Sequence, residues 1–351
     1  MPKIQIGKHF IGEGEKAFII AEAGVNHNGS LERAKELIDK AATVGAGAIK
    51  FQTYKADTLV TKTAPKFWDW EGDKEHKTQH AAYSQLDKFP WENYKILKEH
   101  CDKKGIEFLS TPFDFKSADM LDEIGMVAFK IASSDITYLQ FLSHIAKKGK
   151  PMIISTGAST MLEIKDAVET IKKEGNNKII LLHCNLCYPT KDKDSNLKLI
   201  QTLKDTFPSC EVGLSDHTIG TFAPSIAVAL GASIIEKHYT LDHDLGESAD
   251  HWLSVNPTEL FDLIAKVRKT EEMFGSSEKQ VFDSEFETYK YDKRSITSAR
   301  DIMAGTVITK EDITFKRPGT GIPPKGEKKL LGKRAEVAIP EDTTIEWKMI
   351  C

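Results

Sequence analysis

The chain has 351 residues, of which 40% are hydrophobic and 28% are charged, and its formal net charge at pH 7 is −4. This length allows one large domain or two ordinary ones, each with a buried core. The slightly acidic balance argues against a nucleic-acid partner, and no apolar run reaches the roughly 20 residues of a membrane span. The first residues also lack the apolar segment of a signal peptide, so we expect a cytoplasmic protein with no membrane partner.

The cysteines do not form the pattern of a disulfide-stabilised protein. There are five, an odd number, scattered along the chain as Cys101, Cys184, Cys187, Cys210 and Cys351. This distribution is typical of a reducing compartment. Cys184 and Cys187 have the spacing of zinc ligands, but no second pair of this kind completes a four-ligand site, so we do not favour a structural zinc.

Short apolar runs alternate with helical patterns over the first 275 residues. The runs predict strands at 18–24, 48–52, 106–110, 127–131, 151–155, 178–183, 211–213 and 233–237. Helical spacing and capping residues predict helices at 31–41, 91–104, 116–124, 138–147, 160–174, 196–206, 221–230 and 257–274. This alternation is typical of a (β/α)8 TIM barrel. A doubly wound sheet is the alternative, but no G-x-G-x-x-G sequence follows the first strand.

A long polar segment, residues 53–89, interrupts this alternation after the second predicted strand. It carries Trp68, Trp70 and Tyr83 among many charged residues. A connection of this length in a compact domain is usually functional, so we expect it to take part in choosing the substrate.

The pattern changes after residue 275. Residues 276–292 are polar and irregular and predict a linker between a catalytic domain at 1–275 and a small β-rich domain at 293–351. Segments 304–308 and 340–345 look like two copies of one turn-and-strand unit. A domain of about 60 residues buries a small fraction of its surface and is only marginally stable alone, so we expect it to pack on a barrel, its own or a partner's.

Polar residues follow every predicted strand of the barrel. Active sites of such barrels lie at the carboxyl ends of the strands, so these side chains should line one mouth. They are Glu22, Asn26, His27, Asn28, Lys50, Gln52, Ser110, Thr111, Lys130, Ser133, Ser134, Asp135, Ser155, Thr156, His183, Asn185, Tyr188, Ser215, Asp216, His217, Glu236 and His238.

Lys50 and Lys130 each end a strand that should be buried on both faces, where an unpaired ammonium is costly. One interpretation is that they neutralise a phosphate and a carboxylate, helped by nearby hydroxyls. One of them could instead form a Schiff base, as in a class I aldolase. Each could also pair with Glu22, Asp135 or Glu236 as part of barrel packing.

His217 and His238 follow two strands that the helix at 221–230 joins, so the two strands run parallel and both histidines emerge at the same end. Two imidazoles with open positions suit a Lewis-acid metal site for a carbonyl substrate. Alternatively, both are core or capping histidines. Glu22 is the nearest carboxylate for proton transfer, and Asp250 lies in a loop that could reach over the mouth.

Several motifs resemble those of the sialic acid synthases and their legionaminic and pseudaminic acid relatives. They are IAEAGVNHNG at 20–29, IKFQT at 49–53, LSTPFD at 109–114, KIAS at 130–133, STG at 155–157, GLSDHT at 213–218, EKH at 236–238 and KRPG at 316–319. These motifs are in the family's order and cover nearly the whole chain. The last segment resembles the SAF domain of these enzymes, an antifreeze-like β-clip fold.

The resemblance implies that phosphoenolpyruvate (PEP) condenses with an open-chain N-acetylated amino sugar, N-acetylmannosamine or a diacetamido-trideoxyhexose. The products would be a nine-carbon 2-keto-3-deoxy acid and phosphate. A divalent metal, Mn²⁺ with Mg²⁺ or Co²⁺ as alternatives, would be bound by His217 and His238. The implied catalytic residues are Glu22, Lys50, Lys130 and Asp250; the PEP-binding residues are Lys50, Gln52, Thr111, Lys130, Ser133, Ser155 and Ser215; the substrate-binding residues are Asp135, Asn185, Tyr188, Asp250 and Arg317.

The resemblance also implies a homodimer in which the SAF domain of one subunit caps the partner's barrel and brings Arg317 to it. Three departures bear on the substrates. Leu186 stands where relatives have a small polar residue, so one PEP contact is missing or is replaced by Asn185. Ser134 stands where glycine is common, and ESADHW at 247–252 replaces the more usual Gly-Pro-Asp-His.

Two other functions stay open at this point. A related condensation of PEP with an aldose phosphate, of the deoxyoctulosonate or deoxyheptulosonate phosphate type, would use phosphorylated aldoses, and the SAF-like segment argues against it. A non-catalytic carbohydrate-binding module would require the polar mouth to be accidental.

Overall fold

The computed structural model describes residues 3–68, 76–245 and 250–351. The chain divides into two compact units, Met1–Gly275 and Ser276–Cys351, and each is described by itself. Trp70 and residues 247–249 of the ESADHW loop lie outside the described residues. Of the helices that the structure describes, none is long and apolar enough to span a bilayer.

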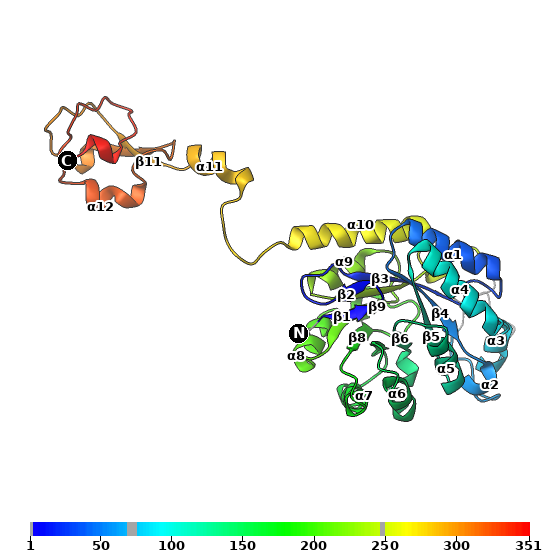
Figure 1. Cartoon of the computed structure of the whole chain (residues 1–351). Coiled ribbons are helices and arrows are strands. Elements are labelled where there is room, and N and C mark those ends of the chain that lie inside the picture. The colour runs from blue at the N-terminus through cyan, green and yellow to red at the C-terminus, as the bar shows by residue number, and fades with distance from the viewer. Residues whose placement is uncertain (1–2, 69–75, 246–249) are drawn as a thin grey trace. The chain divides into compact units, whose positions relative to one another are not determined.

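The larger unit is a barrel of eight parallel strands with helices around it (Figure 1). The strands are β3 (Phe18–Gly24), β4 (Ala48–Thr53), β5 (Glu107–Pro112), β6 (Phe129–Ile131), β7 (Met152–Ser155), β8 (Ile179–Cys184), β9 (Glu211–Asp216) and β10 (Ile234–His238). They pair in the order β5-β4-β3-β10-β9-β8-β7-β6, and β5 and β6 also pack against each other. The predicted (β/α)8 barrel is therefore confirmed.

The outer helices are α1 (Leu31–Thr43), α4 (Trp91–Lys104), α5 (Phe115–Glu123), α6 (Leu139–Ala146), α7 (Met161–Lys173), α8 (Leu199–Thr206), α9 (Phe222–Ala229) and α10 (Pro257–Phe274). Each buries one apolar stripe against the barrel, as the helical spacing predicts. The predicted capping box of Thr160 with Glu163 is present, and Asn256 with Glu259 forms a second one. These caps satisfy backbone N–H groups that the first helical turn leaves without partners.

Four short elements go beyond the prediction. The hairpin of β1 (Ile4–Ile6) and β2 (His9–Ile11) precedes the barrel, and α2 (Ala56–Leu59) and α3 (Gln79–Leu86) lie within the polar segment 53–89. Each is too short for periodicity to distinguish it from a loop.

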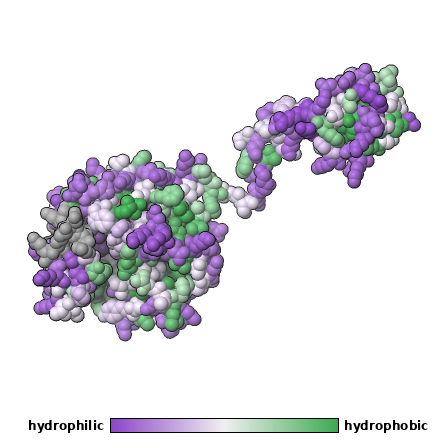
Figure 2. Space-filling view, turned by 180° about the vertical axis from the view of Figure 1, so that it is seen from behind, coloured by the Kyte–Doolittle hydropathy of each residue, from purple (hydrophilic) through white to green (hydrophobic). Residues whose placement is uncertain are grey.

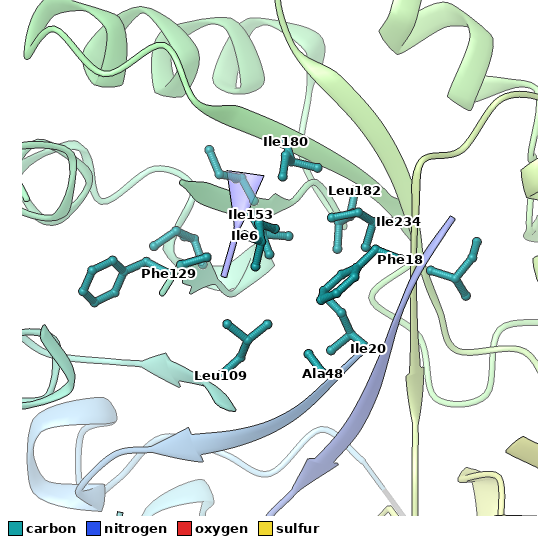
Figure 3. Close-up of a cluster of buried hydrophobic side chains, with 14 of the residues drawn as sticks. Ile6, Phe18, Ile20, Ala48, Leu109, Phe129, Ile153, Ile180, Leu182 and Ile234 are labelled. Atoms are coloured by element: carbon teal, nitrogen blue, oxygen red, sulfur yellow. The ribbon is translucent and has the colours of Figure 1, made fainter. Parts of the chain in front are cut away.

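The barrel interior is filled with apolar side chains, so it is a packed core and not a pore. Figure 3 shows labelled side chains from β3, β4, β5, β7, β8 and β10 converging there, together with Ile6 from the hairpin. The strands are buried on both faces, which explains their continuous apolar runs. Gly213 lets β9 approach β10 closely, since a Cβ at this position would lie 2.4 Å from the carbonyl oxygen of Ile234.

The smaller unit has its own hydrophobic core, built around Ile296, Ile308, Leu330 and Ile345. Its antiparallel sheet pairs β11 (Ser295–Ser298) with β12 (Ile313–Lys316), and short helices α11 (Phe286–Tyr291) and α12 (Glu327–Leu330) complete it. Isolated bridges such as Ile302 to Ile339 link its first and second halves.

Figure 2 shows hydrophilic and hydrophobic residues mixed on the surface of each unit. One segment of the smaller unit is notably apolar. Its side chains Val281, Phe282, Phe286, Tyr289 and Tyr291 are each 47–59% exposed. Residues 276–292, predicted as an irregular linker, therefore include a helix with aromatic residues on its surface.

Candidate active site

Two lysines and two glutamates meet at the carboxyl ends of the strands, all of them at most 5% exposed. Lys50 Nζ lies 2.6 Å from Glu22 Oε2 and 4.0 Å from Glu236 Oε2. Lys130 Nζ lies 3.6 Å from Glu236 Oε1. The strand register produces this arrangement, because Glu22 pairs with Lys50 on β4 and with His238 on β10. The pairing of lysines with glutamates that the sequence left open is thus observed.

Hydroxyl groups surround the two ammonium groups. Lys50 donates a hydrogen bond to Thr111 Oγ1 at 2.9 Å, and Lys130 donates one to Ser155 Oγ at 2.7 Å. Ser133 Oγ accepts a hydrogen bond from the backbone N–H of Gly157 at 3.0 Å. The structure therefore brings both predicted lysines into direct contact with a predicted hydroxyl, that of Thr111 or Ser155, in a buried cluster. Such a cluster can bind an anion with two acidic groups through charge-assisted hydrogen bonds.

Glu236 is the central residue that the predicted site set omits. Its Oε1 accepts a hydrogen bond from Ser215 Oγ at 2.9 Å, and both lysines lie nearby. Burial raises the pKa of Glu236, but Lys130 and Lys50 outweigh burial, so the pKa is below its ordinary value. Its place at the end of an apolar strand was the available sequence signal, and this signal suggested only a packing partner for a lysine.

Glu22 has the opposite electrostatic character. Its burial, only partly opposed by Lys50, raises its pKa from 4.5 to about 7. Gln52 Nε2 donates a hydrogen bond to Glu22 Oε1 at 3.1 Å and helps to orient the carboxyl group. A carboxyl group that titrates near neutral pH can act as either a general acid or a general base.

His217 and His238 lie side by side, with ring centroids 5.2 Å apart. His217 Nδ1 lies 2.7 Å from the backbone carbonyl oxygen of Asn185, so this nitrogen carries the proton and Nε2 keeps its lone pair. His238 Nδ1 is buried and has no hydrogen-bond partner within the described part of the chain; it lies 3.5 Å from Asp250 Oδ2. This arrangement fits two imidazole ligands of one divalent cation.

The described residues contain no cluster of three or more His, Cys, Asp or Glu side chains arranged to hold a metal ion. A cation on His217 and His238 would therefore take its other ligands from substrate or water. This is consistent with a site that keeps open positions for a substrate oxygen.

Tyr188 packs on both imidazoles. Its ring centroid lies 4.1 Å from that of His217 and 5.6 Å from that of His238. Asn185 lies beside it, but its side-chain amide donates a hydrogen bond to the carbonyl of Asp194 at 2.8 Å. In this arrangement the amide of Asn185 is engaged with the following loop, and its backbone carbonyl holds His217. Leu186, the next residue, is 41% exposed.

Asp135 and Asp250 provide two further carboxyl groups, both half-buried. Burial raises the pKa of Asp135 to about 6, with Lys130 acting in the opposite direction. Burial likewise raises the pKa of Asp250 to about 6, opposed by His217. Both groups are therefore partly protonated near neutral pH and can exchange hydrogen bonds with hydroxyl groups of a sugar.

Two further predicted residues, Arg317 and Trp68, belong to other segments of the chain. Arg317, in the smaller unit, forms an ion pair with Asp292. In the polar segment, Trp68 contacts Tyr83, whose ring contacts Tyr54 after β4, with centroids 5.6 and 5.7 Å apart.

Comparisons with known proteins agree with this geometry. The NeuB family model matches residues 37–279, and the SAF domain model matches residues 293–350. An N,N'-diacetyllegionaminic acid synthase of Legionella pneumophila is 42% identical, over 97% of this chain and 96% of that protein. The human N-acetylneuraminate-9-phosphate synthase is 32% identical, over 97% of this chain and 94% of that protein. The crystal structure of an N-acetylneuraminic acid synthetase from Leptospira borgpetersenii, in complex with citrate, is 38% identical with a TM-score of 0.73, covering 82% of this chain and 94% of that one.

The fold and the site place this chain in the class of (β/α)8-barrel proteins that have a polar, charge-paired mouth and a small C-terminal β domain. The chain belongs to the NeuB family, which includes the sialic, legionaminic and pseudaminic acid synthases, and it carries a C-terminal SAF domain.

Proposed function

We propose that this chain condenses PEP with an open-chain N-acetylated amino sugar to give a nine-carbon 2-keto-3-deoxy acid and phosphate. The relatives named as legionaminic, pseudaminic and N-acetylneuraminate-9-phosphate synthases support this reaction class. The higher identity to the legionaminic acid synthase favours a diacetamido-trideoxyhexose as the acceptor, with N-acetylmannosamine as the alternative.

The observation that carries the proposal is the buried pair of lysines with its hydroxyl partners. Lys50 and Lys130 would exchange their glutamate contacts for the carboxylate and phosphate of PEP. Thr111, Ser133, Ser155 and Ser215 would donate hydrogen bonds to the same oxygens, with Gln52 beside them. Lysine is a good partner for phosphate because its ammonium is a compact point charge with three donors.

The reaction then has two bond-forming events. Carbon 3 of PEP attacks the aldehyde carbon of the sugar, a carbon–carbon bond forms, and the aldehyde oxygen takes up a proton. Water adds to carbon 2 and loses a proton, after which the bond between carbon 2 and the phosphate oxygen breaks and phosphate leaves. Glu22, with its pKa near 7, would exchange these protons, and Asp250 is the second candidate.

A divalent cation held by His217 and His238 would supply Lewis-acid polarisation of the aldehyde, and we propose Mn²⁺, with Mg²⁺ or Co²⁺ as alternatives. Asp135, Asn185, Tyr188 and Asp250 would contact the sugar. The loop that contains Asp250 and the segment with Trp68 would select it.

We also propose that the chain works as a homodimer in which the SAF domain of one subunit caps the partner's barrel and brings Arg317 to it. The exposed aromatic side chains of residues 281–291 support contact with a second subunit, because removing apolar surface from water lowers the free energy. An arginine fits this role because its guanidinium binds carboxylates and phosphates with two parallel hydrogen bonds.

The experiment that tests this function is an assay of phosphate release from PEP with a panel of acceptors. The panel contains diacetamido-trideoxyhexoses, N-acetylmannosamine, its 6-phosphate, arabinose 5-phosphate and erythrose 4-phosphate, each with and without Mn²⁺. We expect release with an unphosphorylated acetamido sugar and Mn²⁺. Release only with arabinose 5-phosphate or erythrose 4-phosphate would favour the deoxyoctulosonate or deoxyheptulosonate phosphate type. Activity that survives EDTA, with a covalent intermediate that borohydride traps, would indicate a Schiff-base aldolase.

A further inference from the structure

Lys237 and Asp216 form a buried ion pair on the face of the barrel wall that points away from the mouth. Their side chains are 0% and 2% exposed, and Lys237 Nζ lies 2.7 Å from Asp216 Oδ2. The two residues are register partners on β10 and β9. Their neighbours Glu236 and Ser215 contact each other inside the mouth, and successive strand residues point to opposite faces.

The pair ties together the two residues that flank His217. Asp216 Oδ1 accepts a hydrogen bond from the backbone N–H of Thr218 at 2.9 Å. Lys237 Nζ donates a hydrogen bond to the backbone carbonyl of Thr218 as well as to Asp216. His217 is therefore the middle residue of a turn whose two ends are held by one carboxylate and one ammonium group.

The ring and the backbone of His217 are also held from the loop after β8. The carbonyl of Asn185 accepts the Nδ1 proton at 2.7 Å, and the backbone N–H of Thr190 donates to the carbonyl of His217 at 2.9 Å. The ion pair adds a further restraint, because it holds the turn at 216–218 through both backbone groups of Thr218.

We propose that Lys237 and Asp216 are positioning residues that aim His217 Nε2 at the divalent cation, and this inference rests on the proposed metal requirement. Stability alone does not account for the pair, because a buried ion pair is often no more stabilising than two well-packed neutral side chains. Groups that orient a metal ligand from behind, in contrast, commonly change metal affinity by roughly 10- to 100-fold when they are removed.

The test is the Mn²⁺ dissociation constant of the full-length protein, measured by electron paramagnetic resonance without substrates. We expect Lys237→Met to weaken Mn²⁺ binding by roughly 10- to 100-fold. This variant leaves Asp216 buried without its partner, so it also loses stability. The double variant Asp216→Asn with Lys237→Met removes both charges, and its amide oxygen can still accept from Thr218. We expect it to recover thermal stability but not Mn²⁺ affinity, because nothing then holds the carbonyl of Thr218.

Recovery of Mn²⁺ affinity together with stability in the double variant would overturn the proposal, as would wild-type affinity in Lys237→Met. Lys148→Met is the control, since Lys148, just after α6, pairs with Asp119 of α5 at 2.6 Å outside the barrel wall and should not affect the metal. The Mn²⁺ concentration for half-maximal activity should rise in Lys237→Met while the KM for PEP stays unchanged. If the wild-type protein binds no Mn²⁺, the metal part of the proposed function fails together with this inference.

Discussion

At the scale of single residues, the mouth contains two buried glutamates whose pKa values are shifted in opposite directions. Glu236 is surrounded by Lys50, Lys130 and Ser215, so it stays ionised and keeps both ammonium groups in place. Glu22 has a pKa of about 7 because burial outweighs its contact with Lys50. Two carboxyl groups whose environments separate their pKa values can divide the roles of charge stabilisation and proton transfer.

Replacing Glu22 by glutamine should lower kcat by about 10²- to 10⁴-fold, the usual contribution of a general acid or base. The residual activity should lose the limb of the pH profile near pH 7. Rate measurements from pH 5 to 9 on both proteins check this expectation. An unchanged profile in Glu22→Gln would show that another group titrates in that range.

The same substitution has a consequence for stability. Because folding raises the pKa of Glu22 from 4.5 to about 7, the stability that its neutral form provides is complete below about pH 4.5 and is lost as the pH rises through about 7. Glutamine resembles the neutral carboxyl group. The Tm of the wild-type protein relative to Glu22→Gln should therefore fall across this window, and parallel Tm curves would contradict the raised pKa.

Alanine at His217 or His238 should abolish Mn²⁺ binding and turnover while the circular dichroism spectrum remains that of the wild type. Both imidazoles face the mouth and not the apolar core, so their loss should leave the barrel folded. His100→Ala is a suitable control, because His100 pairs with Asp39 on the outer helices. Full activity of either variant in EDTA would contradict the metal role.

At the scale of elements, the strand and helix order of the barrel could be predicted because its strands are continuous apolar runs and its helices carry caps and one apolar stripe. The two-residue extension of β5 and the start of β6 at Phe129 could not, since they depend on pairing between strands and not on local composition. The strand ends also located Lys50, Lys130 and their hydroxyl partners, whereas Asp216, expected at the mouth, pairs with Lys237 on the opposite face of the strands. The direction of an individual side chain was beyond the sequence, as Asn185 illustrates.

The close approach of β9 and β10 gives a prediction at this scale. Gly213→Ala should destabilise the barrel by about 1–3 kcal/mol, because its Cβ would meet the backbone carbonyl of Ile234 at 2.4 Å. Gly47→Ala is the matched comparison, since its Cβ would meet the ring of Phe18, a side chain, at 2.4 Å. Urea unfolding should show the larger loss for Gly213→Ala, and the reverse order would contradict the close approach.

At the scale of the whole molecule, the chain combines a barrel that contains the charged cluster with a small unit that contains Arg317. Each unit has its own hydrophobic core. In the proposed dimer the small unit would take part in catalysis, because it would bring the guanidinium of Arg317 to the partner's mouth, next to Lys50 and Lys130.

Arg317→Ala should lower kcat/KM by about 10²-fold, the usual cost of removing one charge-stabilising donor from an active site, without changing the Tm. Arg334→Ala is the control within the same unit, since its guanidinium donates to the carbonyl of Gly305 at 3.0 Å. Deletion of residues 276–351 should have an effect at least as large as that of Arg317→Ala. If kcat/KM were unchanged after the deletion, the SAF domain would have no part in catalysis.

The most direct test of the central claim is the fate of the bridging oxygen of PEP. With ¹⁸O between carbon 2 and phosphorus, Mn²⁺ and an acetamido sugar that supports turnover, the proposed reaction puts the label entirely in phosphate and takes the new ketone oxygen from water. Mass spectrometry of phosphate and of the nine-carbon acid measures both. Label retained in the acid, or phosphate released without any nine-carbon acid, would contradict condensation at this mouth.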